Sequence, residues 1–253
     1  MTSGSVRPPG AAGTHRLSGD PTSGRAFSTT PVPEWGSRFP WLRAGTTRRI
    51  VGRDGVPPLH DMLVLTAGSP WRTVVRSRQV HGPLTRIHAD APSGLQVVGE
   101  GDGHATRDAG VLLTVTIADC VPVFIADPDA RAVGLLHAGW RGTAAGVVES
   151  GIGALERAFG SRPDDMAVHL GPAICGQCYE VGPEVFRALG EPMAATPGSI
   201  DLRRVVRRRA ARCGVRDERM TVSGDCTLCG DGGYFSHRRG DAGRQRAYIG
   251  IVA

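Results

Sequence analysis

Residues 111–120 read Val-Leu-Leu-Thr-Val-Thr-Ile-Ala-Asp-Cys, and residues 132–142 read Ala-Val-Gly-Leu-Leu-His-Ala-Gly-Trp-Arg-Gly. Both stretches begin as apolar runs of strand length and end in a polar turn, a pattern typical of strands that are buried on both faces. Cys120 ends the first run and His137 ends the second. We therefore expect a buried sheet that carries a thiol and an imidazole at its strand ends.

The rest of the chain alternates between strand-like and helical patterns. Further strand-like runs lie at 73–80, 95–98, 166–170, 219–223 and 246–252. Residues 143–159 and 183–189 have apolar side chains at helical spacing, and each segment ends at a glycine. Asp201 is a candidate N-cap for a third helix. This alternation predicts one mixed α/β domain.

The N-terminal segment has a different composition from the rest. Residues 1–40 are rich in Pro, Gly, Ser and Thr and show no periodicity, so we expect a disordered tail before a domain over 41–253. No apolar signal-peptide core follows Met1, and the longest apolar stretch, 111–126, is interrupted by Asp119 and Pro122. A cytoplasmic protein without a membrane partner is expected.

The basic residues are all arginine. The 30 Lys-plus-Arg positions contain no lysine, and the chain has no asparagine, which excludes a Schiff-base or P-loop lysine and an Asn-oriented Cys–His pair. The net charge of +6 suits anionic ligands. Seven arginines cluster between Arg203 and Arg216, but no aromatic residue is interleaved with them. We interpret this cluster as the solvated face of an amphipathic helix and expect no nucleic-acid partner.

His81 is a third candidate donor beside Cys120 and His137. It stands in Gln79-Val-His-Gly82, directly after the strand-like run 73–80. Zinc accepts thiolate and imidazole ligands, and a site with three protein ligands keeps a fourth position for chemistry. Two alternatives remain at this point. Each residue is an isolated core side chain, or Cys120 is a nucleophile with His81 or His137 as its base.

The turn after His137 is a candidate anion site. Gly139 and Gly142 allow close approach of the backbone to a ligand, and Arg141 offers a bidentate donor. A helix that begins near Gly142 would add its free N–H groups. The alternative is a tight strand-to-helix connection with a solvated arginine. Arg238, in the arginine-rich segment before the last strand, belongs either to a second anion-binding wall or to an exposed hairpin.

The remaining cysteines include two Cys-x-x-Cys pairs. Cys175 and Cys178 form the first pair, and Cys226 and Cys229 form the second, about fifty residues later. Together they are candidates for a closed four-cysteine zinc site, which we rank below the His81–Cys120–His137 site. The first pair lacks the preceding proline and the upstream His-x-Glu of nucleobase deaminases.

Several motifs in one order make the family recognisable. From about residue 41 to the C-terminus the chain resembles the family once called polyphenol oxidase or laccase-domain proteins, now described as purine nucleoside phosphorylases, whose bacterial members include a peptidoglycan editing factor. The resemblance rests on Gln79-Val-His-Gly, Gly101-Asp-Gly, Ala118-Asp-Cys-Val-Pro-Val, His137-Ala-Gly-Trp-Arg-Gly, Gly171-Pro-Ala-Ile, Cys178-Tyr-Glu-Val-Gly, Asp201-Leu, Cys226-Thr and Phe235-Ser-His-Arg-Arg.

The resemblance implies a three-layer α/β/α sandwich with a mixed sheet, and Zn²⁺ bound by His81, Cys120 and His137, with copper as the less favoured alternative. It implies a transferase that uses phosphate to cleave adenosine, inosine and S-methyl-5′-thioadenosine, with adenosine deaminase (hydrolase) activity beside it. Thr46-Thr-Arg48 matches an early family segment, so Arg48 joins Cys120 and His137 as a candidate catalytic residue. Gly139, Arg141 and Arg238 are the candidates for binding nucleoside and phosphate.

Three other functions compete with this one. A cysteine-type or metal-dependent amidase would edit a mis-loaded peptidoglycan precursor. A multicopper laccase needs paired His-x-His motifs, and none of the 8 histidines forms one. A non-enzymatic, zinc-stabilised module would unfold on chelation and turn over no nucleoside.

Overall fold

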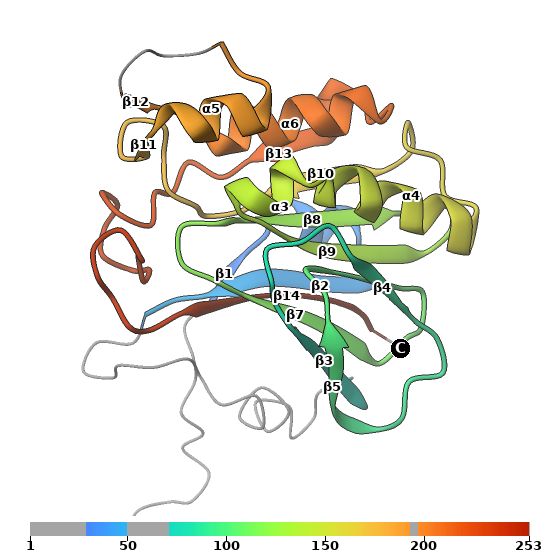
Figure 1. Cartoon of the computed structure of the whole chain (residues 1–253). Helices are drawn as coiled ribbons and strands as arrows, with labels where there is room; N and C mark the ends of the chain where they lie inside the picture. Colours follow the sequence, from blue (N-terminus) through green and yellow to red (C-terminus); the bar gives the residue numbers. More distant parts are fainter. Residues whose placement is uncertain (1–28, 50–70, 193–196, 253) are drawn as a thin grey trace, which may run out of the picture.

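The computed structural model describes residues 29–49, 71–192 and 197–252. Within these ranges, two six-stranded sheets pack against each other, and helices cover the other face of one sheet (Figure 1). The expected mixed α/β domain is confirmed. The strands that the sequence assigned to one mixed sheet are divided between two, so the described layers are helices, sheet B and sheet A.

Sheet A is mixed. Its strand order is β1 (Thr29–Pro31), β2 (Leu42–Thr47), β14 (Gln245–Ile251), β7 (Val111–Ile117), β3 (Thr73–Arg78) and β5 (Gly94–Glu100). The C-terminal strand β14 pairs antiparallel with β2 and β7, whereas β3 pairs parallel with β7 and β5. Because β3, β5 and β7 are parallel, their carboxyl ends lie at one edge of the sheet.

Sheet B lies between sheet A and the helices. Its strand order is β13 (Met220–Val222), β10 (Ala167–Leu170), β8 (Val121–Asp127), β9 (Ala132–Ala138), β6 (Gly103–Thr106) and β4 (Thr85–His88). The pair β8–β9 is antiparallel, and β10–β13 and β4–β6 are parallel. A small pair, β11 (Glu180–Val181) and β12 (Gly198–Ser199), lies apart from both sheets.

The neighbouring strands β8 and β9 of sheet B are buried on both faces, which explains their largely apolar sequences. Along β8, Val123 and Ile125 pack in the core toward the helices, and Phe124 and Ala126 pack in the core toward sheet A. Successive side chains of a strand point to opposite faces. A strand buried on both faces therefore has no polar alternation.

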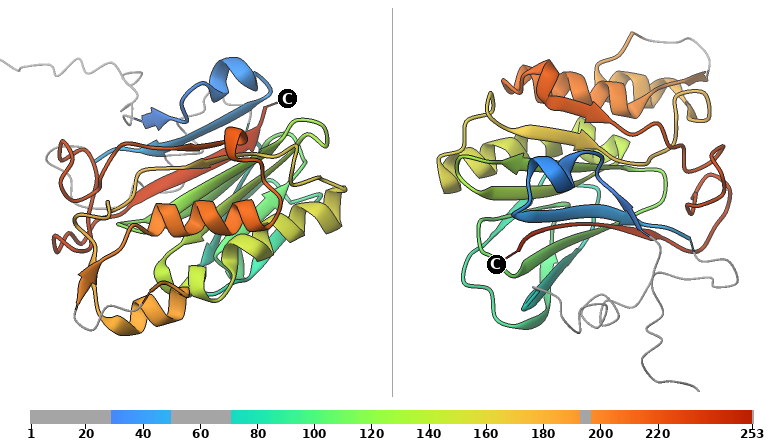
Figure 2. Two further views of the ribbon diagram at one scale, coloured as in Figure 1. Left: turned by 90° about the horizontal axis from the view of Figure 1, so that it is seen from above. Right: turned by 180° about the vertical axis from the view of Figure 1, so that it is seen from behind.

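Four helices cover sheet B. They are α3 (Trp140–Ala144), α4 (Val147–Phe159), α5 (Pro183–Leu189) and α6 (Leu202–Arg212), and a short 3₁₀ turn (Asp217–Arg219) precedes β13. Figure 2 shows α4 and α6 lying beside each other over the sheet. The expected cap is present, since the Asp201 side chain accepts a hydrogen bond from the Arg203 N–H. The helix predicted over 143–159 is instead two helices, because the chain turns at Gly146, where φ is 92°.

The predicted tail boundary at residue 40 is too late. Residues 29–40 contain β1 and the helix α1 (Trp35–Arg38), and Trp35 and Phe39 are buried in the core between the sheets. Their rings meet edge to face at 5.5 Å. The apolar contacts of two aromatic side chains thus order a segment of weak local propensity. Residues 1–28 of the predicted tail lie outside the described residues. Among the described helices, none has both the length and the apolar character that crossing a membrane requires.

The chain passes from sheet A to sheet B three times at one end of the domain. The connections β3–β4, β5–β6 and β7–β8 each begin at the carboxyl end of a parallel strand of sheet A. Side chains on these three connections are therefore brought together by the topology. This end of the two sheets carries the candidate site.

Candidate metal centre

Each of the three crossings contributes one polar side chain. His81 follows β3, Asp102 follows β5, and Cys120 follows β7. His137 comes from sheet B, where it lies in β9 opposite Pro122 of β8, two residues after Cys120. His81 and Cys120 therefore meet because of the parallel order of sheet A, and the pairing of β9 with β8 brings His137 to them.

The three predicted donor residues lie together. The ligand atoms of His81, Cys120 and His137 are all within 4.8 Å of one another. The two imidazole rings are 4.8 Å apart, centroid to centroid, and tilted by 70°. His137 is buried, Cys120 is half-buried and His81 is exposed. This arrangement suits an ion that is held by three ligands and is reachable from solvent on the His81 side.

Asp102, which the sequence reasoning did not select, holds two of the donors in place. Its carboxylate is fully buried, and its Oδ1 accepts hydrogen bonds from His137 Nδ1 at 2.8 Å and from the His81 N–H at 3.0 Å. Its Oδ2 accepts from the N–H groups of Val80 and Gly82, at 3.0 Å and 2.9 Å. The four bonds fix the His81 turn, where φ is 58°, and leave His137 Nε2 for an ion.

The side chains of Asp102, Cys120 and His137 shift one another's pKa values toward their charged forms. Burial raises the pKa of Asp102, but the hydrogen bond from His137 and the backbone N–H groups outweigh it and hold the pKa below its usual value. Burial also raises the pKa of the Cys120 thiol, yet the charges and hydrogen bonds of His137 and His81 lower it to about 6. Burial lowers the pKa of His137, while Cys120 and Asp102 raise it to about 9.

Two chemical uses follow from these shifts. At neutral pH Cys120 is a thiolate, the form of cysteine that binds metal ions and attacks carbonyl groups. One sulfur and two imidazoles form a donor set that zinc accepts, with a fourth tetrahedral position left open. The buried carboxylate behind a histidine ligand is a recurrent part of zinc sites. The residues present therefore fit one zinc ion.

The same residues do not fit a multicopper centre. Such a centre needs several histidines for a cluster of copper ions, whereas only two described histidines share this group. The buried pair His88 and His104 is used internally, since His88 Nε2 and His104 Nδ1 lie 2.9 Å apart and His104 Nε2 bonds to Ser77.

Gly139 closes one side of the metal group. A Cβ atom at this position would lie 2.8 Å from Cys120 Sγ and 3.0 Å from His81 Cδ2. The φ of Gly139 is −77°, so space rather than backbone conformation requires glycine here. The Gly139 backbone is close to the side chains of Cys120 and His81, and its predicted approach to a ligand stays a prediction.

Tyr179, which the sequence did not single out, lies beside the predicted anion-binding residue Arg238. The Arg238 guanidinium lies 5.3 Å from the centre of the Tyr179 ring. Burial, followed by the negative charge of Cys120, raises the pKa of Tyr179 to about 12, and Arg238 and Arg141 oppose this shift. Tyr179 is therefore a neutral phenol within electrostatic reach of both arginines and the thiolate. Arg141 itself stacks on Trp140 at 4.4 Å.

Asp119 connects Cys120 to the C-terminal loop and was also missed. Its Oδ1 accepts a hydrogen bond from Thr227 Oγ1 at 2.6 Å, and its Oδ2 accepts from the Arg238 N–H at 2.7 Å. Its backbone φ is 82°. Such a conformation is unusual outside glycine and recurs at functional sites. The sequence signal was the Ala-Asp-Cys motif, of which only the cysteine was assigned a role.

Arg48 is not in contact with the three donors. It follows β2 at the same end of sheet A, but β14 separates β2 from the Cys120 strand β7. Its guanidinium forms an ion pair with Asp231 and lies 5.2 Å from the centre of the Tyr234 ring. A catalytic role for Arg48 stays a prediction.

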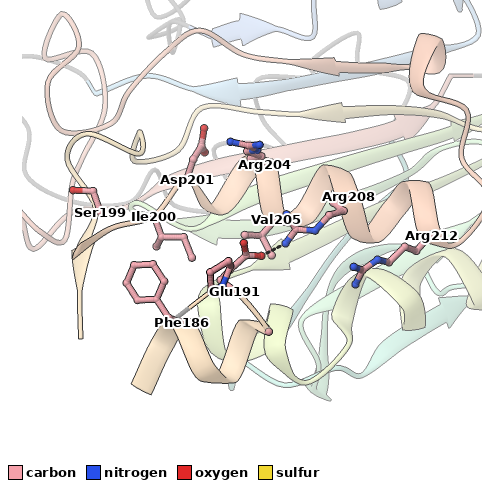
Figure 3. A pocket seen from close by; sticks show the side chains of 11 residues that line it. Phe186, Glu191, Ser199, Ile200, Asp201, Arg204, Val205, Arg208 and Arg212 are labelled. Carbon is pink, nitrogen blue, oxygen red and sulfur yellow. Dashed lines mark ion pairs between the residues drawn. The ribbon is translucent and has the colours of Figure 1, made fainter. Parts of the chain in front are cut away.

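A separate cavity lies between α5 and α6 (Figure 3). Its volume is about 580 Å³, and its walls include Phe186, Ser199 and three α6 arginines, but no residue of the metal group. Arg208 on this wall pairs with Glu191. Elsewhere on the helix, Arg207 pairs with Asp217 and Arg209 with Glu149, both at 2.8 Å. Most of these arginines thus form ion pairs at the helix surface, but Arg203, expected on a solvated face, is buried and donates to the carbonyls of Ser223 and Asp225.

Comparisons with known proteins show the family of this chain. Residues 59–252 match the family described as multi-copper polyphenol oxidoreductase laccase. A curated relative from Deinococcus radiodurans, named purine nucleoside phosphorylase, is 39% identical over 70% of this chain and 69% of its own length. A relative from an unknown prokaryotic organism, named adenosine deaminase RL5, is 33% identical over 79% of this chain and 84% of its own length.

A solved structure shares the fold. It is the crystal structure of YlmD from Geobacillus stearothermophilus, with a TM-score of 0.76 and 31% sequence identity, over 85% of this chain and 93% of that one. The curated sequence of that name is called purine nucleoside phosphorylase YlmD. The curated relatives thus carry the names of nucleoside-processing enzymes.

Proposed function

Since this chain belongs to the family described as multi-copper polyphenol oxidoreductase laccase, we propose that it is a zinc-dependent purine nucleoside phosphorylase. It would convert adenosine, inosine or S-methyl-5′-thioadenosine with phosphate into the free base and the sugar 1-phosphate. The single observation that carries this proposal is the convergence of His81, Cys120 and His137 beside the buried Asp102. The phosphorylase names of the relatives support the substrate class.

The reaction makes defined demands on the site. A phosphate oxygen forms a bond to C1′ of the ribose while the bond from C1′ to the purine nitrogen breaks. The purine leaves with the electron pair and takes up a proton. Phosphate has to be held close to C1′ in the right orientation, and the charge that develops on the base has to be stabilised.

Side chains around the metal group meet these demands in the proposal. Arg141 and Arg238 would hold the phosphate, since guanidinium groups bind phosphate oxygens bidentately. The neutral Tyr179 phenol, with its pKa of about 12, can donate a hydrogen bond to substrate at neutral pH. Zinc, when bound by His81, Cys120 and His137, would supply a Lewis-acid position. Asp102 would keep His137 and the His81 turn aligned for it.

Adenosine deamination is proposed as a second activity of the same site. There, water adds to C6 of the purine and the amino group leaves as ammonia, so neither phosphate nor a bond to C1′ is involved. The relative named adenosine deaminase supports this activity. The two activities are separable by their dependence on phosphate.

A specific observation favours one other function, a cysteine-type amidase that edits a mis-loaded peptidoglycan precursor. Cys120 with a pKa of about 6 beside His137 with a pKa of about 9 resembles a thiolate–imidazolium pair. In that reaction Cys120 Sγ would bond to the amide carbon, His137 would protonate the departing amine, and water would release the acid. A Cys120 sulfur that is bound to zinc is a poor nucleophile, so the two functions are exclusive at one time.

The deciding experiment compares two cysteine variants of zinc-loaded protein. Cys120→Ser is expected to abolish phosphate-dependent release of hypoxanthine from inosine, and Cys213→Ser, a half-buried cysteine outside both cysteine-containing groups, is expected to leave it unchanged. His81→Ala should also abolish release while circular dichroism shows a folded protein. Full phosphorolysis by Cys120→Ser would overturn the proposal. Stoichiometric alkylation of Cys120 in zinc-loaded wild-type protein would favour the amidase.

A further inference from the structure

Two loops distant in sequence meet beside the candidate active site. Cys175-Gly-Gln-Cys178 lies between β10 and β11, and Cys226-Thr-Leu-Cys229 lies between β13 and β14. The parallel pairing of β10 with β13 continues past the strand ends, where Ala173 forms a bridge with Cys226 and accepts a hydrogen bond from the Thr227 N–H at 3.1 Å. The backbone therefore places the two Cys-x-x-Cys turns next to each other.

The sulfur atoms have the spacing of a tetrahedral metal site. The four Sγ atoms lie within 4.8 Å of one another, and those of Cys175 and Cys229 are 3.8 Å apart. With zinc–sulfur bonds of about 2.3 Å, tetrahedral geometry separates two sulfur ligands by about 3.8 Å. A disulfide requires about 2.05 Å between its sulfur atoms. The Cys175–Cys229 pair therefore has the separation of two ligands and not of a covalent bridge.

Backbone hydrogen bonds close both turns, and those to the Cys226 sulfur resemble the bonds of a metal-binding knuckle. The Cys226 Sγ accepts from the N–H groups of Cys175 and Cys229, at 3.2 Å and 3.5 Å. The Cys178 N–H donates to the Cys175 carbonyl at 3.0 Å, and the Gly230 N–H donates to the Cys226 carbonyl at 3.1 Å. Donors aimed at a sulfur stabilise its thiolate form, which is the form that binds a metal ion.

We propose that Cys175, Cys178, Cys226 and Cys229 bind a structural zinc ion, distinct from the ion at His81, Cys120 and His137. Four thiolates complete the coordination sphere, so this ion has no open position for a substrate and serves to join the two loops. Each thiol that binds releases its proton to solvent. The inference concerns different residues from the proposed function and stands independently of it.

Two of the four cysteines are adjacent in sequence to residues near the candidate active site. Tyr179 directly follows Cys178, and Thr227 directly follows Cys226 and donates to Asp119, the neighbour of Cys120. Arg239 donates to the carbonyls of Thr227 and Leu228. An ion that joins the two turns would therefore fix the positions of Tyr179 and Thr227 relative to Cys120.

Zinc counting tests the proposal. Protein purified without chelators is digested, and zinc per chain is measured by mass spectrometry. Wild type and Cys213→Ser are expected to hold two zinc ions per chain, Cys178→Ser and Cys229→Ser one, and His81→Ala one. If zinc is unchanged in both Cys178→Ser and Cys229→Ser, or if intact mass shows a disulfide among the four cysteines of reduced and repurified wild type, the structural site is ruled out.

A second measurement covers the case in which the cysteine variants do not fold. His81→Ala protein is stripped of zinc, reloaded with cobalt(II) and examined by absorption spectroscopy. The proposal predicts intense visible bands of tetrahedral cobalt and strong thiolate-to-cobalt charge transfer, because four thiolates remain. Featureless spectra in folded protein would overturn it. Loss of the His81 site alone leaves this signal intact, so failure of one site is distinguishable from failure of the other.

Discussion

His137 and Asp102 share a 2.8 Å hydrogen bond from imidazole Nδ1 to carboxylate Oδ1, although they lie 35 positions apart, with Asp102 in the β5–β6 connection and His137 in β9. Their backbones are also joined, since the His137 N–H donates to the Asp102 carbonyl at 2.7 Å. Asp102 thus holds His137 by two hydrogen bonds, one from the imidazole ring and one from the backbone N–H. This double attachment aims Nε2 at the space that Cys120 and His81 share, before any ion binds.

Replacing Asp102 should therefore weaken metal binding without removing a ligand. In Asp102→Asn the side chain keeps its size but loses its charge. The two carboxylate oxygens of Asp102 together accept four hydrogen bonds, from Val80, His81, Gly82 and His137. The amide NH₂ group that replaces one oxygen cannot accept the bonds of that oxygen. Loss of such an outer partner lowers zinc affinity by about 10–100-fold. Competition with a chromogenic chelator measures the zinc affinity of each variant. Asp164→Asn, an exposed carboxylate paired with Arg162, is the control and should bind zinc as wild type does.

A methyl group at Gly139 should disturb the metal group directly. The new Cβ in Gly139→Ala would lie 2.8 Å from Cys120 Sγ, so the sulfur or the 139 backbone has to shift. We expect zinc affinity and nucleoside turnover to fall by about tenfold or more, because site geometry tolerates little displacement. Gly36→Ala is the matched control, since nothing lies within 4 Å of its added carbon. Equal turnover in the two variants would show that residue 139 does not shape the site.

Arg141 should affect phosphate more than nucleoside. Charge-assisted hydrogen bonds contribute about 1.5–3 kcal/mol, so Arg141→Ala is expected to raise the KM for phosphate by about 10–100-fold. Phosphate-independent adenosine deamination should change little. Steady-state kinetics with each substrate varied separates the two effects. An Arg162→Ala variant, which loses an exposed arginine paired with Asp164, should match wild type. A normal phosphate KM in Arg141→Ala would show that Arg141 does not bind phosphate.

The protein should lose stability on mild acidification because it buries neutral histidines. Burial lowers the pKa of His169 to about 4 in the folded protein, against 6.5 for the ordinary side chain. Between these values the unfolded chain binds a proton that the native protein does not, so the contribution of His169 is complete above pH 6.5 and declines toward pH 4.

The size of this effect can be measured. At pH 5, protonation of the unfolded chain at His169 lowers the free energy of unfolding by about 2 kcal/mol relative to neutral pH. His88 and His104, with pKa values lowered by burial to about 4 and about 3, act in the same direction. Denaturant titrations at pH 7.5 and pH 5 compare wild type with His169→Gln. The variant should show a smaller difference between the two pH values, and an identical difference would contradict the assignment.

The candidate donor residues could be selected from the sequence, but Asp102, which positions them, could not. Cys120 and His137 could be selected because each ends a long apolar run, and such runs can be recognised without knowledge of the fold. Asp102 lies in a short Gly-Asp-Gly connection before β6, whose residues Gly-His-Ala-Thr have no apolar periodicity. Its importance arises only when β3, β5 and β7 align in parallel, which is a non-local property of the chain.

The same distinction applies to the fold. The strands β7 and β9 were predicted because they are apolar throughout, whereas β2, with the sequence Leu-Arg-Ala-Gly-Thr-Thr, has weak strand propensity and was missed. Trp35 lies in a segment rich in proline and glycine, yet its burial between the sheets orders that segment. The division into two sheets depends on strand pairing, and hydrophobic periodicity does not encode which strands pair.

The most direct test is a crystal structure of the zinc-loaded protein with diffraction data recorded on both sides of the zinc absorption edge. The account predicts an anomalous peak within bonding distance of the Cys120 sulfur and of one imidazole nitrogen each from His81 and His137, with the fourth position open to solvent or ligand. Zinc-loaded crystals in which no anomalous peak lies among these three side chains would contradict it.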